Sequence, residues 1–473
     1  MLSKSTQGGI AMKFVKDWGK ETDIVIIGTG FAGLSTAIET NNSGLKVIIL
    51  EKLPSPGGNS IIAGGGINAV DPERQKKQGI QDSLDLHFRQ TFEGGDNLGC
   101  KEKIKYMVEH SLEESVHWLE NMSVKFPEEV ELGYGALWPR THRQARYRQY
   151  RRGAAIVHAL FDQLKCRKDV QILFNHKMVK IIREDCLKGL VQGVEVESKG
   201  QRFFIKAKKG VVLATGGFAA NSKWVSKHDL RLIDIDNDNH KGATGEGIKI
   251  AQDIGADTLH MDYIQTVPKD VRLPFKAMAF YVCAQELHEK FNHPHQSRSF
   301  PYWIFINKEG KRFINEDARR IDIRKNMLQQ PTFDPIPHVT AGSISELEKR
   351  LSIPKGNLER TIDNYNQFCA NKKDKEWGKN PECLIPFQIA PFEARSVAPK
   401  SHFTMGGLRT NLTGQVIDRE ASIIPNLYAV GEVVGGLHGA NRLGHNATPE
   451  CIVFGRLCGK TIGNSILPDS SDN

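Results

Sequence analysis

The sequence contains no run of about 18 apolar residues, the length that a membrane-spanning helix needs. Its start, "MLSKSTQGGIAMKFVKDWGKE", also has no apolar core of the length that a secretory signal peptide requires. The 8 cysteines are scattered without CxxC, CxxCH or zinc-type spacing. These absences exclude c-type haem and iron–sulfur ligation within this chain and predict no metal site. They also predict reduced thiols and a cytoplasmic location.

A glycine-rich turn lies near the amino terminus, in "TDIVIIGTGFAGLSTAIETNNSGLKVIILEK". The pattern of this segment predicts a strand, a tight turn, a helix and a second strand. The apolar run 23–27 fits a strand buried on both faces. Gly28, Gly30 and Gly33 have the GxGxxG spacing, which permits the turn, the approach of a pyrophosphate and close packing of helix on strand. Glu51 ends the next strand, where it can accept hydrogen bonds from ribose hydroxyls. The segment therefore predicts a dinucleotide site.

The segment "PGGNSIIAGGGINAV" favours FAD over NAD, because so many glycines let a long, flat cofactor lie against bare backbone. Its "SIIA" part is too apolar for a flexible linker. The segment contains no histidine that could bond covalently to a flavin, so we expect non-covalent FAD. Further backbone approaches to the cofactor are expected at "KMVKII", "GVVLATGGF" and "KGATGEG". The predicted FAD contacts are Gly28, Gly30, Ala32, Gly33, Glu51, Lys52, Gly58, Asn59, Ser60, Gly65, Gly66, Val179, Ala214, Thr215, Gly216, Thr244, Gly245 and Glu246.

The order of patterns along the chain predicts an α/β protein with a discontinuous Rossmann-like FAD-binding domain and an inserted α+β domain. Three alternating segments between residues 171 and 208 predict an antiparallel excursion. A segment rich in aromatics, prolines and histidines begins near Asp262. The cofactor-type pattern resumes with "TMGGL". The predicted parts are an extension (1–20), the FAD domain (21–260 and 403–465), the inserted domain (261–402) and a tail (466–473).

Much of the net charge of +9 lies in "RTHRQARYRQYRRG", residues 140–153. Arginines interleaved with tyrosines can grip single-stranded nucleic acid by charge and stacking. They can equally flank a site for small anions or form a basic helix surface. No nucleic-acid-binding module accompanies the stretch, so nucleic acid is a disfavoured partner.

Arg319 and Arg320 stand side by side in "FINEDARRIDI". Most such pairs belong to solvated charged loops, and the alternative is that one arginine contacts a substrate. The residues alone leave both interpretations open.

Three motifs resemble one known family: "KEGKRFINEDARR" (308–320), "SHFTMGG" (401–407) and "LYAVGEVVGGLHGANRLGHNA" (427–447). They are similar to the flavoprotein subunits of fumarate reductases and succinate dehydrogenases, above all to the soluble branch with flavocytochrome c and urocanate reductase. The resemblance covers roughly residues 20–465. It implies that the inserted region is a capping domain, and that the activity is FAD-dependent reduction of the C=C bond of a small α,β-unsaturated carboxylate. No haem, iron–sulfur or FMN-domain motif identifies the electron donor or electron-transfer protein.

The resemblance also implies roles for particular residues. Arg442 matches the arginine that binds the substrate carboxylate, whose fork suits bidentate contact. His402 matches a substrate-contacting histidine. Arg320 matches the proton donor, which needs a relay because an arginine has a pKa above about 12. Glu286 is the best match for the relay glutamate, although Glu289 stands where the family has an arginine. The neighbours Arg319 and Arg324 are alternative cations.

One departure from the family concerns the substrate. Where the family has a histidine before the proline, this chain has Val267 in "YIQTVP". That histidine helps to hold one carboxylate of fumarate, so the resemblance implies a substrate with one carboxylate and a different far end. Tyr263, Tyr302 and Trp303 are candidates to line that end, or are core residues.

A helix is expected to begin at Asn446, Ala447 and Thr448. Its free N–H groups and positive end would face the N1–C2=O edge of the flavin and stabilise the charge gained on reduction. Glu432 matches the family's contact to the ribityl chain.

Two alternatives to alkene reduction remain at this point. One is the reverse chemistry, a dehydrogenase that desaturates a carboxylate or a ketosteroid-like substrate. The other is a flavoprotein with a vestigial site that binds nucleic acid or an acidic partner through the arginine stretch.

Overall fold

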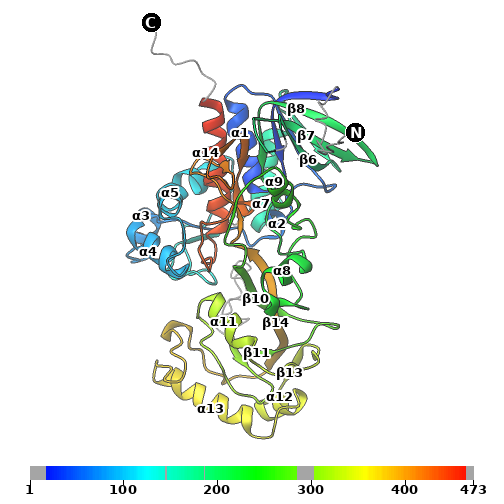
Figure 1. Cartoon of the computed structure of the whole chain (residues 1–473). Coiled ribbons are helices and arrows are strands. Elements are labelled where there is room, and N and C mark those ends of the chain that lie inside the picture. The colour runs from blue at the N-terminus through cyan, green and yellow to red at the C-terminus, as the bar shows by residue number, and fades with distance from the viewer. Residues whose placement is uncertain (1–16, 144–145, 186, 285–302, 465–473) are drawn as a thin grey trace, which may run out of the picture.

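The computed structural model describes residues 17–143, 146–185, 187–284 and 303–464. Figure 1 shows two bodies, one above the other. The upper body is built on an 8-stranded sheet and the lower one on a 5-stranded sheet. Among the described residues, no helix is long and apolar enough to cross a membrane.

The large sheet has the strand order β16, β17, β8, β1, β2, β5. All neighbouring pairs in that order are parallel except β16 with β17. Its strands are β1 (Lys20–Ile27), β2 (Val47–Glu51), β5 (Val170–Phe174), β8 (Gln201–Leu213), β16 (Gln415–Ile417) and β17 (Ile423–Ala429). The predicted apolar run from Ile24 to Ile27 is buried, because the sheet is covered on both faces.

Side chains alternate between two hydrophobic cores along β1. Ile24 and Ile26 belong to the core that also contains residues of α1 and α14, whereas Val25 and Ile27 belong to the core on the other face. Helices α1 (Phe31–Asn42), α7 (Arg152–Leu164) and α14 (Ala447–Asn464) pack together on the first face. Figure 1 shows the first and last of these helices side by side, so the two ends of the chain build one layer.

The predicted antiparallel excursion is present. Strand β6 (Lys177–Arg183) pairs with β7 (Val191–Ser198), which pairs with the long β8, both in antiparallel orientation. The remaining elements of the upper body are β3 (Gly66–Asn68), β4 (Thr141–Arg143), β9 (Thr258–Leu259), β15 (Gly407–Leu408), α2 (Asn59–Ile62), α3 (Pro72–Lys77), α4 (Leu84–Gly94), α5 (Lys101–Ser111), a π-helical turn (Leu112–His117), α6 (Trp118–Glu120), α8 (Ser222–His228) and α9 (Glu246–Asp253).

The lower body has a sheet in the order β10, β14, β11, β12, with β13 also paired to β14. All of these pairings are antiparallel. Its elements are β10 (Ile264–Asp270), β11 (Ala279–Ala284), β12 (Ile304–Ile306), α11 (Arg320–Met327), β13 (Val339–Ala341), α12 (Ile344–Arg350), α13 (Asn357–Ala370) and β14 (Phe392–Thr404). In Figure 1, α12 and α13 lie at the end farthest from the upper body.

The chain enters and leaves the lower body on adjacent strands. Strand β10 pairs with β14 from Ile264 opposite Thr404 to Asp270 opposite Val397. Figure 1 shows these two strands between the two bodies. The predicted fold class, an α/β FAD-binding fold with an inserted α+β body, is confirmed. The boundaries at residues 260 and 402 stay predictions.

A buried ionic cluster holds the segment that precedes Arg320. Arg312 is 2.8 Å from Glu316 and 2.9 Å from Asp374, and Lys379 is 3.3 Å from Glu316. The side chains of Arg312, Glu316, Asp374 and Lys379 are at most 1% exposed. The acidic residue Glu316 in "FINEDARR" is therefore a structural anchor for two buried cations.

Replacing Glu316 by alanine leaves Arg312 and Lys379 buried without their shared counter-charge. We expect Glu316→Ala to lower the free energy of unfolding by about 3–5 kcal/mol. The matched control is Glu73→Ala, because Glu73 forms an exposed ion pair with Lys77 and its loss costs at most about 1 kcal/mol. Urea denaturation of both variants measures the difference, and equal small losses would contradict the assignment.

Candidate active site

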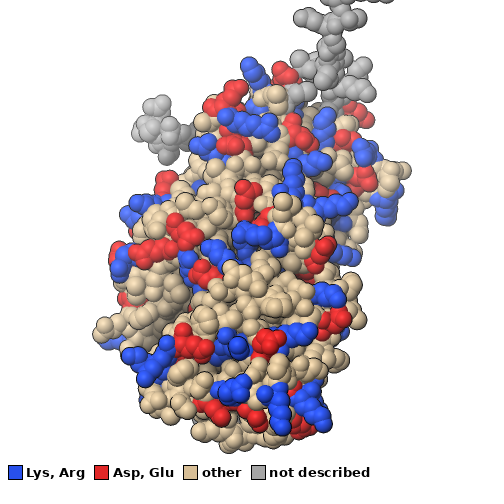
Figure 2. All heavy atoms as spheres, turned by 60° about the horizontal axis from the view of Figure 1, so that its bottom comes forward, with Lys and Arg blue, Asp and Glu red and all other residues tan. Residues whose placement is uncertain are grey.

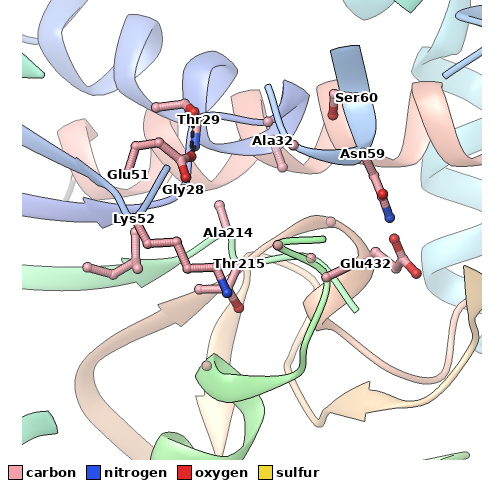
Figure 3. Close-up of a pocket in the computed structure, with 18 of the residues that line it drawn as sticks. Gly28, Thr29, Ala32, Glu51, Lys52, Asn59, Ser60, Ala214, Thr215 and Glu432 are labelled. Atoms are coloured by element: carbon pink, nitrogen blue, oxygen red, sulfur yellow. Dashed lines mark hydrogen bonds between the residues drawn. The ribbon is translucent and has the colours of Figure 1, made fainter. Parts of the chain in front are cut away.

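A first cavity lies at the carboxyl ends of parallel strands β1, β2 and β8. It is lined by the turn after β1, the end of β2, the loop 57–60 and the segments 214–216 and 242–247. Figure 3 shows that these segments surround a common space. Ligands of open α/β sheets bind at this edge, because the loops there leave a crevice.

Glu51 is the polar anchor of the first cavity. Its Oε2 accepts a 2.6 Å hydrogen bond from Thr29 Oγ1, and its Oε1 accepts from the backbone N–H of Leu53 at 3.0 Å. Figure 3 shows Thr29 and Glu51 joined in this way beside Gly28. Ser60 Oγ accepts from the backbone N–H of Phe31 at 3.0 Å. The turn, the loop 57–60 and the acid that ends β2 are thereby held in one arrangement.

Close contacts require glycine at two positions, Gly28 in the turn and Gly33 in the first turn of α1. A Cβ at Gly28 would lie 2.4 Å from the carbonyl oxygen of Ala214, and Gly28 has a φ of 110°. A Cβ at Gly33 would lie 2.1 Å from the carbonyl oxygen of Gly28. Gly33 therefore packs helix against strand, as its place in the spacing predicts, and does not line the cavity.

A second cavity of about 370 Å³ adjoins the first and reaches the lower body. The two cavities share Phe31, Asn59, Ser60, Glu432 and Cys451. A long ligand can therefore extend from Glu51 at one end to the second cavity at the other. The charged or titratable residues of the second cavity are Tyr134, Arg143, Arg152, Asp238, Lys269, Arg320, His402, Glu432, Arg442, His445 and Cys451.

The residues of the joined cavities fit FAD. Thr215 Oγ1 is buried in the first cavity without a hydrogen-bond partner among the described residues, so it is free to bind a polar ligand. At the junction, burial raises the pKa of Glu432 to about 7. Ala447 and Thr448, in the first turn of α14, line the second cavity, where the helix end favours negative charge.

Arg320 begins α11 and points into the second cavity. Its Nη1 donates to Gln265 Oε1 at 2.9 Å and its Nη2 to the carbonyl oxygen of Tyr134 at 3.1 Å. The guanidinium also lies 4.9 Å from the centre of the Tyr134 ring. Within the described residues, it forms no ion pair with a carboxylate, and burial lowers its pKa. Arg319 points away and pairs with Asp322 and with Asp96.

Arg442 is the second buried cation of the cavity. Its Nη1 donates to the carbonyl oxygen of Leu443 at 3.1 Å, and its guanidinium lies 4.5 Å from the centre of the Phe403 ring. Burial and the nearby charge of Arg320 lower its pKa to about 9. No carboxylate of the described residues lies within ion-pair distance of it. Two guanidinium groups thus share one cavity without a carboxylate partner, which suits an anionic ligand.

His402, on β14, completes the predicted substrate group. Its Nδ1 lies 3.0 Å from both carboxylate oxygens of Asp238. Arg320, His402 and Arg442 come from three distant segments, and all three line the second cavity.

Most of the predicted cofactor residues line one of the two cavities. Gly66, Val179 and Asn446, like Gly33, do not line them. Only Lys177 and Met178, the first two residues of β6, border the first cavity, so Val179 lies too far along the strand. Asn446 donates instead to Thr91 Oγ1 at 3.1 Å inside the protein. Glu286 lies outside the described residues.

Several cavity residues were not found from the sequence. Asp238 and Lys269 belong to loop and strand stretches without a recognised pattern, so no signal marked them. His445 had one available signal, its place in "RLGHNA" three residues after Arg442. It has a φ of 65°, and a Cβ at Gly66 would lie 2.4 Å from its Nδ1, so small neighbours make room for its ring. Burial, together with Arg143 and other nearby cations, holds the pKa of His445 well below its usual range.

Of the candidate aromatics that the structure describes, neither Tyr263 nor Trp303 lines the second cavity. Tyr263 lines a separate hollow near His260, and Trp303 packs edge-on against Tyr281 in the core of the lower body. Tyr302 lies outside the described residues. The alternative interpretation, that these aromatics are packing residues, therefore holds for Trp303.

The arginine stretch is divided between the interior, the cavity and the surface, where Arg146, Arg148 and Arg151 are exposed. Arg140 is buried and lies 2.7 Å from Asp82, while Arg143 and Arg152 line the second cavity. Arg148 is also ion-paired. On the face that Figure 2 presents, lysines and arginines are interspersed with acids and form no continuous basic surface. These placements favour the small-anion interpretation over nucleic acid.

Fold and site together define a flavoprotein oxidoreductase whose cofactor cavity opens into a cationic pocket. The chain belongs to the FAD binding domain family, which matches residues 23–448. FAD is therefore its cofactor. Among the described residues, no group of three or more His, Cys, Asp or Glu side chains could hold a metal ion.

Similar proteins include the fumarate reductase (cytochrome) of Shewanella frigidimarina, which is 32% identical over 93% of this chain and 76% of its own length. The acrylate reductase flavoprotein subunit of Shewanella woodyi is 33% identical over 93% of this chain and 90% of its own length. The open conformation of a flavocytochrome c3 fumarate reductase matches with a TM-score of 0.74 and 28% identity, covering 95% of this chain and 79% of that one. The chain is thus a fumarate reductase-like oxidoreductase that acts on C=C bonds.

Replacing Gly33 by alanine would force a Cβ to within 2.1 Å of the Gly28 carbonyl oxygen and so displace the cofactor turn. We expect Gly33→Ala to purify with little FAD, measured as the ratio of flavin to protein absorbance. Gly44→Ala is the control, because a Cβ there meets nothing within 4 Å and its positive φ costs only about 1 kcal/mol. A Gly33→Ala protein with full FAD occupancy would contradict the role of this contact.

Proposed function

We propose that this protein reduces the C=C bond of a small α,β-unsaturated monocarboxylate, drawing electrons from an external donor. The observation that carries the proposal is the pair of buried guanidinium groups, Arg320 and Arg442, which have no carboxylate partner among the described residues and lie in a cavity that adjoins the FAD site. A buried cation that lacks a counter-charge is costly, and an anionic substrate would relieve that cost.

The reaction adds a hydride to one carbon and a proton to the next. FAD, held non-covalently by the residues of the first cavity, would supply the hydride from N5. Arg442 binds the substrate carboxylate through its fork, and His402 contacts the same group. Negative charge grows on the carboxylate side as the double bond is reduced, so fixed cations stabilise the transition state more than the ground state.

Arg320 donates the proton. Burial lowers its pKa, which makes a guanidinium a better acid than it is in water. Gln265 and the Tyr134 carbonyl hold its two terminal nitrogens, so the group keeps one orientation toward the cavity. Glu286 remains the proposed source of re-protonation.

The cavity wall favours a monocarboxylate. Val267 lines the second cavity and is 3% exposed, so an apolar branched side chain stands on the same strand as Gln265 and Lys269. An apolar wall cannot pair with a second carboxylate, which would lose its hydration there without gaining a hydrogen bond. The similarity to an acrylate reductase subunit supports the same class of substrate.

The test of the function is anaerobic. The flavin is reduced with dithionite, and acrylate or fumarate is added while flavin absorbance is recorded. Re-oxidation by acrylate at a higher kcat/KM than by fumarate is expected. If saturated acids bleach the oxidised flavin and no enoate re-oxidises the reduced protein, the enzyme is a dehydrogenase and the proposal is wrong.

The neighbouring arginines give a matched pair of variants. Arg320→Ala removes the proton donor, and we expect it to retain FAD but lose roughly 100- to 10,000-fold in kcat. Arg319→Ala removes an arginine that pairs with Asp96 and Asp322 outside the cavity, so its kcat should stay near that of the wild type. Near-normal turnover by Arg320→Ala would refute the proton-donor role.

A histidine at position 267 should change the choice of substrate. Val267→His places a hydrogen-bond donor on the cavity wall, and a bond to a charged group is worth roughly 1.5–3 kcal/mol. We therefore expect the ratio of kcat/KM for fumarate over acrylate to rise about tenfold or more. Val267→Phe is the control, since it fills the position without a polar group. An unchanged ratio in Val267→His would show that this wall does not select the substrate.

A further inference from the structure

Asp238 is a buried carboxylate in the second cavity that the proposed mechanism has not used. It binds the Nδ1 side of His402 with both oxygens at 3.0 Å and also pairs with Lys269. The side chain of Asp238 is 9% exposed, compared with 31% for His402 and 44% for Lys269. The carboxylate thus lies behind the imidazole and is shared between two cationic residues.

The backbone around Asp238 is fastened to the residue before His402. The N–H of Asp238 donates to the carbonyl oxygen of Ser401 at 3.2 Å, and the N–H of Ser401 donates to the carbonyl oxygen of Asp236 at 2.9 Å. Asn239 Nδ2 donates to the same Ser401 carbonyl at 2.9 Å. The loop therefore holds the Asp238 carboxylate against the His402 ring independently of any ligand.

This contact determines which nitrogen of His402 carries a proton. An ionised carboxylate can only accept hydrogen bonds, so the proton of a neutral His402 resides on Nδ1. Nε2 then carries a lone pair, which repels a carboxylate. His402 can donate from Nε2 to an anionic substrate only when both ring nitrogens are protonated.

The charges around His402 leave it neutral until an anion arrives. Burial lowers the pKa of His402, Arg320 and Arg442 lower it further, and Asp238 opposes them. Although burial alone would raise the pKa of Asp238, His402 and Lys269 hold it well below its usual range, so Asp238 stays ionised. A bound carboxylate adds negative charge and raises the pKa of His402.

We propose that Asp238 is a positioning residue that couples carboxylate binding to proton uptake at His402. The Asp238 carboxylate holds the Nδ1 proton, and the incoming carboxylate draws a second proton from solvent onto Nε2. Affinity and proton uptake are linked, so binding weakens with rising pH by up to about tenfold per unit above the pKa of the free His402. The inference rests on the proposed function for the class of ligand.

The experiment measures binding of propionate to the oxidised holoenzyme by calorimetry between pH 6 and 8. The range ends below the pKa of about 9 for Arg442, whose own deprotonation also weakens anion binding. Glu432 also lines the cavity, and its pKa of about 7 lies inside the range. Proton uptake at His402 is therefore the difference between the wild type and variants that retain Glu432. Repeating each titration in buffers of different ionisation enthalpy counts the protons taken up. The wild type should take up roughly one proton per propionate at the upper end of the range.

The Asp238→Asn variant tests whether Asp238 positions the proton of His402 or has only a structural role. The asparagine amide can donate to Nδ1, which moves the proton of neutral His402 to Nε2, where it can bind propionate at any pH. This variant should bind propionate with a Kd that changes less across the range than that of the wild type, and it should take up about one proton fewer per propionate at the upper end. Lys269→Met is the control: it leaves Asp238 on His402, so proton uptake should persist and shift to higher pH, because Asp238 then acts on His402 alone.

Proton uptake by Asp238→Asn equal to that of the wild type, or its absence in the wild type, would overturn the inference. If acrylate is reduced while propionate binds without proton uptake, the proposed function stands and this coupling alone fails. If propionate does not bind at any pH, the cavity does not bind carboxylates, and both conclusions fail.

Discussion

Two buried guanidinium groups that have no carboxylate partner in the part of the chain that the structure describes are the constraint on which the site depends. The interior tolerates them because each is held by backbone carbonyls, an amide or an aromatic face: Gln265 and Tyr134 for Arg320, and Phe403 for Arg442. These contacts orient the cations without neutralising them. An internal carboxylate would stabilise the fold more, but it would also occupy the charge that an anionic substrate needs.

The two bodies of the molecule supply different parts of the site. The large parallel sheet supplies the cofactor turn, and the loop before α14 supplies Arg442. The inserted body supplies Arg320 at the start of α11 and His402 on β14. Strands β10 and β14 are paired along the passage between the bodies, and Arg320 and His402 line the same cavity as Arg442.

The buried acids of the molecule have two opposite uses. Glu316 and Asp374 together offset the charges of Arg312 and Lys379, and this cluster anchors the segment that carries Arg320. Asp238 only partly offsets the cations of the cavity, where it holds one side of His402. An acid four residues before Arg320 therefore serves the fold, whereas an acid from a distant loop lines the cationic cavity.

The sequence by itself determined the cofactor half of this protein. Strand periodicity, the spacing of Gly28, Gly30 and Gly33 and the acid at Glu51 are local properties of the sequence, and the carbonyl that excludes a Cβ at Gly33 belongs to Gly28, a few residues away. The motif around "RFINEDARR" also indicated Arg320, but not why its neighbour Arg319 differs. Only the tertiary structure decided that, together with the placement of Asp238 and His445 at the second cavity. The partner of a charge is set by segments that lie far apart along the chain, and sequence spacing carries no information about them.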